Sequence, residues 1–189
     1  MMFHFNDKLY FWFLKPVSTG YETVVPTPVR TGVLNFFTNL AAPMRMGSCL
    51  LQGKGEEAGA EFTRLMFNTT FGVLGLGDPA KDYPELNPHD EDLGQTLGAY
   101  GVGNGCYIVW PIFGPSTLRD TVGTMGDVFM NPISYLPLGA SMGITGEEKL
   151  NQTSFRNGDY ESLKEAAIDP YEALRDAYIQ HRQAKVVES

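Results

Sequence analysis

LGQTLGAYGVGNGCYIVWPIFGPSTL, residues 93–118, holds no charged side chain in 26 consecutive positions. A membrane-spanning helix needs about 20 mainly apolar residues, but six glycines and two prolines interrupt this stretch. It therefore cannot form one straight helix. Because irregular backbone is not tolerated against lipid tails, the stretch must be buried in protein, line a cavity or lie at a membrane interface. Residues 128–146 are uncharged as well.

The overall composition is that of an acidic protein with few charges. The 189 residues include 14 Lys and Arg against 22 Asp and Glu, a net charge of −8, and only 19% are charged, against roughly 25% in soluble domains. No basic patch is present, which argues against nucleic acid as a partner. Composition alone favours a glycine-rich soluble core over a protein at a membrane interface, and both interpretations stay open at this point.

Hydrophobic residues recur at helical spacing through most of the chain. Val29, Val33, Phe36 and Leu40 follow the i, i+4, i+7, i+11 pattern of an amphipathic helix. The same periodicity, with prolines and capping residues at its borders, predicts helices near residues 6–15, 26–43, 44–52, 56–71, 90–100, 116–131 and 159–189. We therefore predict an all-α fold in a single domain over residues 1–189.

Three local features complete this prediction. Pro16 is expected to end the first helix, and Asp169 is expected to cap a new start at Pro170. Residues 107–110 are the one β-like run, too short and isolated to build a sheet. Residues 132–146, rich in proline and glycine, are expected to form a hairpin-like segment.

One pattern suggests nucleophilic catalysis. GASMG at residues 139–143 matches the Gly-x-Ser-x-Gly elbow, with Asp169 and His181 following Ser141 in the order of an α/β-hydrolase. The elbow needs a strand before it and a helix after it, and Pro137 and the glycines argue against both. The alternating βα units of a hydrolase are also absent from the pattern. Small residues in a mobile segment are the simpler interpretation.

The other candidates for chemistry are few. His4, His89 and His181 are far apart and lack an i+4 partner, so we expect no metal site and no cofactor. Arg119-Asp120 borders the 26-residue uncharged run. Charges beside so much apolar sequence are costly unless they are paired or face water, so this pair either lines a polar cavity or fixes a buried corner.

A collinear set of short motifs resembles one known family, the MlaA (VacJ) lipoproteins of the Gram-negative outer membrane. Together the motifs extend over about residues 5–182. They are FNDKLY (5–10), VPTPVR (25–30), GVLNFFTNL (32–40), LQG (51–53), NTTFG (68–72), DPA (78–80), EDLGQTLG (91–98), YGVG (100–103), GPSTLRD (114–120) and DPY (169–171).

This resemblance implies a ring of amphipathic helices embedded in the inner, periplasmic leaflet of the outer membrane, with a central pore. Its members are not enzymes but translocation channels, which remove mislocalised phospholipids from the outer leaflet. They pass the lipid to a soluble periplasmic carrier for retrograde transport, and trimeric porins are their membrane partners. A small lipid-acting serine hydrolase using Ser141 is the alternative.

The resemblance also implies roles for individual residues. Four polar residues are expected at or near the pore, namely Asn68, Gln95, Arg119 and Asp120. The segment 132–146 is expected to gate it, with its bends at Pro132, Pro137, Gly139 and Gly143. The helix that shapes the ring is expected to use Asn35, Phe36 and Phe37.

The sequence departs from the family at its start. Met1-Met2 leads directly into Phe3 without a basic and apolar leader, and neither Cys49 nor Cys106 can serve as the lipidated N-terminal cysteine. We expect the lipid anchor to belong to the full-length protein.

Overall fold

The computed structural model describes residues 1–188, which form helices and one two-stranded hairpin. The all-α class predicted from the sequence is confirmed. The helices are α1 (Met2–Leu9), α2 (Lys15–Val24), α3 (Thr27–Leu40), α4 (Ala42–Leu51), α5 (Gly55–Phe71), α6 (Leu93–Ala99), α7 (Leu118–Met130), α8 (Leu138–Ser154), α9 (Asp159–Ala166) and α10 (Pro170–Glu188). A π-helical turn η1 (Tyr10–Leu14), the 3₁₀ turns η2 (Pro79–Asp82), η3 (Pro84–Leu86) and η4 (Pro132–Tyr135), and strands β1 (Tyr107–Trp110) and β2 (Gly114–Thr117) connect them.

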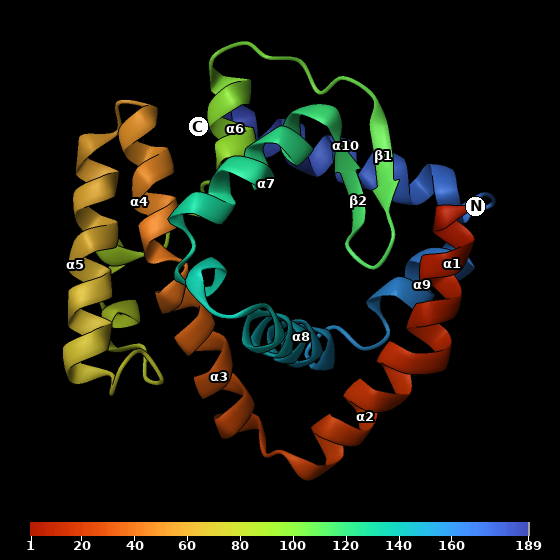
Figure 1. The fold of residues 1–189 in the computed structure, drawn as a ribbon, viewed down its shortest axis with the longest axis horizontal. Helices are drawn as coiled ribbons and strands as arrows, with labels where there is room; N and C mark the ends of the chain where they lie inside the picture. Colours follow the sequence, from red (N-terminus) through yellow and green to blue (C-terminus); the bar gives the residue numbers. More distant parts are fainter. Residues whose placement is uncertain (189) are drawn as a thin grey trace.

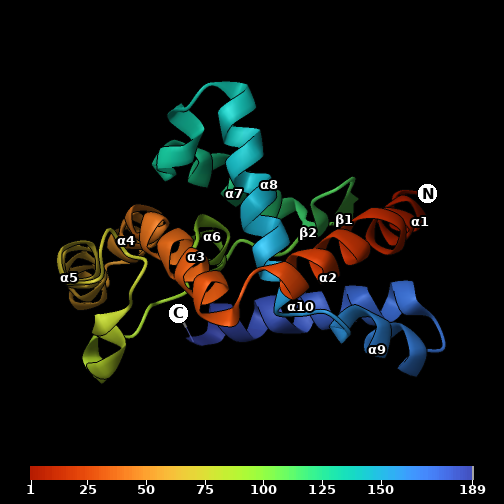
Figure 2. The ribbon, with the colours of Figure 1, turned by 90° about the horizontal axis from the view of Figure 1, so that it is seen from below.

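The elements follow one another around a rounded outline (Figure 1). From the N-terminus, α1 lies on the right, α2 and α3 form the lower part and α4 the left part. Helix α5 lies outside α4, and α7 and the hairpin return along the top. Helix α8 is seen end-on within this outline and lengthwise from the side (Figure 2). In the side view α9 and α10 form a separate lower layer.

Pro16 does not end the first helical segment, so that prediction was wrong. The backbone N–H of Lys15 donates to the Tyr10 carbonyl, which is the wider spacing of a π turn. Pro16 then occupies the first turn of α2, where its missing N–H is tolerated. The helical path therefore continues to Val24.

The prediction that residues 107–110 are too isolated to build a sheet was also wrong. Strand β1 pairs antiparallel with β2, with Tyr107 opposite Thr117 and Trp110 opposite Gly114. Strand β2 reads GPST, a composition that carries no strand signal. Its turn includes Ile112, a non-glycine residue at φ 70°.

Residues 132–146 do not form a hairpin. They comprise η4 and the first half of α8, with Pro137 in extended conformation at the N-cap position. The second half of α8 is held by buried polar contacts: Asn151 donates to the Arg30 carbonyl at 3.0 Å, and Arg30 donates to the Ser154 carbonyl at 3.0 Å. These contacts stabilise α8 as a helix, although the glycine-rich sequence of its first half does not predict one.

Candidate functional site

Asp120, in the first turn of α7, lies at the centre of a buried hydrogen-bond network. Its backbone N–H donates to the capping hydroxyl of Thr117 at 3.2 Å. Arg119 donates to Oδ1 at 3.0 and 2.9 Å. Arg182 of α10 donates to Oδ1 and Oδ2 at 2.9 and 3.1 Å, and the Tyr178 hydroxyl donates to Oδ2 at 2.9 Å.

A second carboxylate, Asp92, joins the same network from the start of α6. Arg182 donates to its two oxygens at 2.6 and 2.8 Å. Asp92 also caps α6 by accepting from the backbone N–H of Gln95 at 2.8 Å. We call this set the aspartate network: Asp92, Gln95, Arg119, Asp120, Tyr178 and Arg182. It brings together three of the four residues expected near a pore, Gln95, Arg119 and Asp120.

The charges of the aspartate network stabilise one another. Burial would raise the pKa of Asp120 and of Asp92, but hydrogen bonds and charge from Arg182 outweigh it and hold both pKa values below the usual range. Burial would lower the pKa of Arg182, and the two carboxylates raise it instead. Asp127, two turns later on the same face of α7, behaves oppositely: burial raises its pKa to about 6, although it accepts from the Leu93 N–H at 3.2 Å.

Glycines let α6 lie directly against α7. A Cβ on Gly123 would come within 2.3 Å of the Gly94 nitrogen, and a Cβ on Gly94 within 2.6 Å of the Arg182 guanidinium. Side chains at either position would force the helices apart and open the aspartate network. Arg119 and Asp120 therefore fix a buried corner, one of the two roles that the sequence left open.

Asn68 of α5 belongs to a different network. Its Nδ2 donates to Asp78 at 2.8 Å, and its Oδ1 accepts from the Ala80 N–H at 3.1 Å. Arg64 reaches the same Asp78 and also donates to the Leu86 carbonyl at 2.7 Å. Asn68 thus holds the loop after α5 in place, and its role at a pore stays a prediction.

An apolar cavity of about 400 Å³ lies between α3, η4 and α8. We call it the α3 cavity. Phe36 and Phe37 line it from α3, and Pro132, Ile133 and Ile144 line it from the other side. The helix expected to shape a ring and the segment expected to gate it therefore share one cavity. Asn35 lies at the edge, donating to the Leu76 carbonyl at 3.3 Å.

The segment 132–146 has few polar ties to the rest of the protein. Within the described residues, its hydrogen bonds outside regular helix join partners at most six positions apart, such as the Tyr135 hydroxyl with the Phe129 carbonyl at 2.6 Å. Pro137, Gly139 and Gly143 lie at the start of α8, where a Cβ on either glycine would meet open space. This segment is thus held mainly by apolar contact with α3.

Ser141 does not occupy a nucleophile elbow. It lies in the first turns of α8, preceded by a 3₁₀ turn rather than a strand, and its hydroxyl donates to the Leu138 carbonyl at 3.0 Å. Asp169 accepts from the Tyr171 and Glu172 N–H groups at 2.8 and 3.2 Å and caps α10, as predicted. The strand and helix context that a hydrolase needs is not formed around Ser141.

Polar side chains fill much of the interior, and apolar side chains cover much of the surface. Glu61, Asn151, Ser18 and Ser48 are among the most buried residues described. Large apolar residues are exposed in every part of the chain, for example Trp12 (78% exposed), Phe113 (76%) and Phe129 (75%). This is the reverse of the usual distribution in a water-soluble domain. Within residues 1–188, no helix has both the length and the apolarity to cross a membrane.

The sequence did not predict that Arg182, Asp92 and Tyr178 belong to the same network as Asp120. Arg182 lies 62 and 90 positions from its carboxylate partners, so no local pattern connects them. The only signal was its spacing, four residues after Tyr178 on the same face of α10.

Comparison with known proteins identifies relatives along almost the whole chain. The family model described as MlaA lipoprotein matches residues 1–185. The intermembrane phospholipid transport system lipoprotein MlaA of Escherichia coli K12 is 37% identical over 95% of this chain and 72% of its own length. The protein of the same name from Haemophilus influenzae is 33% identical over 92% of this chain and 70% of its own.

A solved structure agrees with these relatives. It is described as the structural basis for maintenance of bacterial outer membrane lipid asymmetry, and it superposes with a TM-score of 0.86 at 34% identity, over 98% of this chain and 94% of the other. The motif resemblance seen in the sequence is confirmed: the chain belongs to the MlaA lipoprotein family.

Proposed function

We propose that this protein transports phospholipids and maintains lipid asymmetry in the outer membrane. The names of its relatives place them in an intermembrane phospholipid transport system, and the description of the similar solved structure concerns outer-membrane lipid asymmetry. It lies in the inner leaflet and forms a ring around a lipid path. Mislocalised outer-leaflet phospholipids pass along this path to a periplasmic carrier. No covalent chemistry is required, because a lipid head group needs only a polar route and a downstream sink.

The inverted distribution of side chains carries this proposal. Each Å² of apolar surface in water costs about 25 cal/mol relative to burial, so a surface with Trp12, Phe113 and Phe129 exposed is unfavourable in solution. Among acyl chains the same apolar surface is removed from water, and this cost disappears. Amphipathic helices that bury an apolar face among acyl chains lie in the plane of the membrane, and this is the arrangement that we propose.

Flotation tests the embedding. The purified chain is exchanged from detergent into phospholipid vesicles and centrifuged on a density gradient, with and without salt. A salt concentration of about 1 M shortens the electrostatic screening length to about 3 Å and so weakens attraction between charges. We expect the protein to float under both conditions, because apolar contacts are not screened. A protein that stays at the bottom, or that salt releases, would contradict the proposal.

The aspartate network is proposed to form the fixed wall of the lipid path. Arg119 and Asp120 lie on the buried face of α7, and Gln95 lies on α6, which packs against α7. The exposed face of α7 carries apolar residues at helical spacing, among them Val122, Met125 and Phe129. Asn68 is proposed to act on the second wall, because the loop that it anchors contributes Leu76 to the α3 cavity.

Residues 132–146 are proposed to be the gate. Their contact with Phe36 and Phe37 is apolar and can slide without breaking a buried hydrogen bond. A flexible thiol-reactive crosslinker between Phe36→Cys and Leu136→Cys, in a Cys106→Ser background, tests this. We expect crosslinked cells to accumulate outer-leaflet phospholipid, measured with an impermeant amine-reactive label.

Two controls separate the gate from general damage. Treatment with the same crosslinker should leave transport by each single-cysteine variant unchanged, and transport by the crosslinked double variant is compared with that of the same variant before treatment. Normal transport by the fully crosslinked double variant would show that this segment is not the gate.

We propose one partner for each of two exposed surfaces. A porin trimer is proposed to contact the apolar outer face of α5, where Phe62, Met66 and Phe71 are exposed. The charged lower layer of α9 and α10 is proposed to face the soluble carrier (Figure 2). Phe62→Lys with Met66→Lys should abolish recovery of the porin in detergent pull-downs, whereas substitutions in α9 should leave it unchanged.

A further inference from the structure

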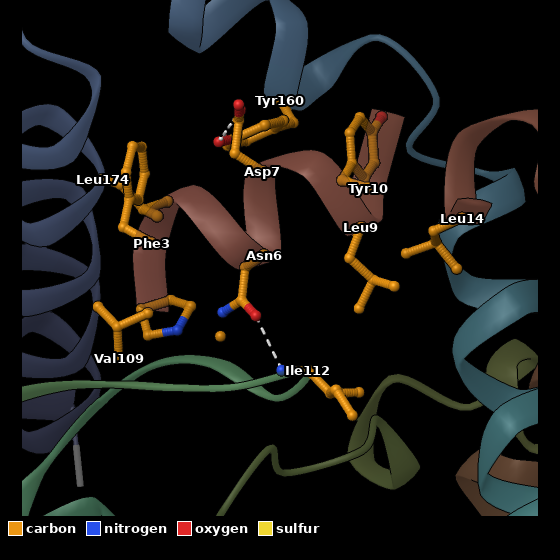
Figure 3. Close-up of a pocket in the computed structure, with 12 residues that line it drawn as sticks. Phe3, Asn6, Asp7, Leu9, Tyr10, Leu14, Val109, Ile112, Tyr160 and Leu174 are labelled. Carbon is orange, nitrogen blue, oxygen red and sulfur yellow. Dashed lines mark hydrogen bonds between the residues drawn. The ribbon is translucent and has the colours of Figure 1, made fainter. Parts of the chain in front are cut away.

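The N-terminal helix closes a second apolar cavity, distant along the chain from the α3 cavity. We call it the N-terminal cavity. Its volume is about 210 Å³. Its apolar walls come from α1, η1, β1 and α10, including Phe3, Leu9, Val109 and Leu174 (Figure 3). Figure 3 shows these side chains converging on the same space.

Asn6 holds the hairpin over this cavity. Its Nδ2 donates to the Trp110 carbonyl at 2.8 Å, and its Oδ1 accepts from the Ile112 N–H at 2.8 Å. Both backbone groups of the turn are therefore satisfied by one side chain of α1 (Figure 3). This pair of bonds keeps the strained turn at Ile112 in register above Leu9 and Leu14.

Helix α9 forms the polar border of the cavity. The Tyr160 hydroxyl donates to Asp7 at 2.9 Å, and the Lys164 ammonium donates to the same oxygen at 2.6 Å. Burial would raise the pKa of Asp7, but the bonds from Lys164 and Tyr160 outweigh it and keep the carboxylate charged. Because an ammonium has three donors and the Lys164 side chain is 34% exposed, Lys164 can bind a second acceptor.

A larger cavity of about 670 Å³, whose walls combine apolar and charged side chains, adjoins the N-terminal cavity, and we call it the head-group cavity. The two share Phe3, Asp7 and Val109 as walls. The charged and titratable groups that line the head-group cavity are the Met1 amino group, His4, Asp7, Lys164, Asp169 and Tyr171. Asp7 is paired with Lys164, whereas Asp169 is exposed and caps α10 through one oxygen.

We infer that the two cavities form a binding site for one phospholipid with an amine-bearing head group. An acyl chain enters the N-terminal cavity, the phosphate binds Lys164, and the ammonium binds Asp169. Lys164 offers a cationic donor to the phosphate and Asp169 offers a carboxylate to the ammonium. Partners of both signs in one cavity match a zwitterion better than a net anion. The inference rests on the proposed function, and it places a lipid outside the path along α7.

Photo-crosslinking in vesicles tests the site. The probe is a phosphatidylethanolamine with a diazirine near the end of one acyl chain, and adducts are mapped by peptide mass spectrometry. We expect adducts on the peptides of α1 and the hairpin to saturate as the probe fraction rises. Adducts at boundary positions away from the lipid path, such as Met66 on the outer face of α5, should instead rise linearly. Linear labelling at both places would overturn the inference.

Variants locate the acyl chain and the head group. Val109→Trp, which fills the shared wall, should lower cavity adducts at least fivefold, whereas Val24→Trp, at an exposed position of α2, should leave them unchanged. Lys164→Gln should lower labelling by the phospholipid about threefold and leave labelling by a diazirine diacylglycerol unchanged. Equal labelling by a phosphatidylglycerol probe would overturn the zwitterion assignment.

Flotation of the same variants separates this inference from the proposed function. If Val109→Trp floats like the unaltered chain but cavity adducts persist, the site is refuted and the embedding stands. If the unaltered chain does not float, the proposed function fails first. The saturation measurement needs no variant, so the test holds even if Val109→Trp does not fold.

Discussion

The aspartate network and the segment 132–146 lie at opposite ends of α7 and are built in opposite ways. At one end, hydrogen bonds between buried charged side chains join α6, α7 and α10, and moving one of these helices would break them. At the other, η4 and the start of α8 meet α3 through apolar side chains. Charged contacts are directional and apolar contacts are not. One helix therefore joins a fixed corner to a region that can move.

Removing Arg182 should have the largest effect. Arg182→Met leaves Asp92 and Asp120 buried without their common cation, and we expect a loss of about 3–5 kcal/mol in the free energy of unfolding. Thermal unfolding in detergent, followed by circular dichroism, measures it. Arg175→Met on the same helix breaks only an exposed pair with Asp176 and should change nothing measurable. Equal effects of the two variants would refute the special role of the network.

A pair of glycine substitutions contrasts the two ends of the comparison. Gly123→Ala places a methyl group against the Gly94 backbone and should destabilise the protein by about 1–3 kcal/mol. Gly143→Ala, in the open first half of α8, should stabilise it by up to about 1 kcal/mol because alanine favours helix. We expect Gly143→Ala to slow lipid transport while raising the melting temperature. A destabilised Gly143→Ala variant would show that this half of α8 is packed.

Asp127 should make stability depend on pH. Its pKa is raised to about 6 by burial, so the protonated form stabilises the fold. That contribution is complete below about pH 4 and lost as the pH rises through 6. We expect the free energy of unfolding to fall by roughly 1–2 kcal/mol over this window, after allowing for solvent screening.

Asp127→Asn should remove most of that fall, because the amide keeps an acceptor for Leu93 without titrating. Glu148, whose pKa is also raised by burial, accounts for the remainder. Asp92 and Asp120 titrate below their usual range and contribute outside this window. An unchanged pH profile in the variant would refute the assignment.

Ser141→Ala should have the smallest effect. The hydroxyl donates only to the Leu138 carbonyl one helical turn away, so stability should stay within about 0.5 kcal/mol. Outer-leaflet phospholipid should also stay at its normal level. Esterase activity of the purified protein that disappears in this variant would restore the hydrolase interpretation.

Local patterns predicted most helices because amphipathic periodicity and capping act over a few residues. Asp169 before Pro170 was correctly predicted as a cap. The helix predicted near residues 90–100 is α6, and Asp92 is its N-cap. The start of α8 was not predictable in this way. Its proline and glycines disfavour helix locally, and the contacts of Asn151 and Arg30 that support the helix join residues 121 positions apart.

The candidate site was only partly visible in the sequence for the same reason. Arg119 and Asp120 stood out because they border an uncharged run, yet their partner Arg182 is distant. The cavity at Phe36 and Pro132 likewise needs three elements in place. The fold class and the family could be read from the sequence, whereas the pairing within the site could not.

The most direct test of the account measures where the exposed apolar surface lies. Nitroxide labels at Trp12→Cys, Phe113→Cys and Phe129→Cys, each in a Cys106→Ser background, are compared in vesicles for collision with oxygen and with a water-soluble nickel chelate. The account predicts high oxygen and low nickel accessibility at all three positions, with the reverse at Asp176→Cys in the lower layer. High nickel accessibility at the three apolar positions would contradict it.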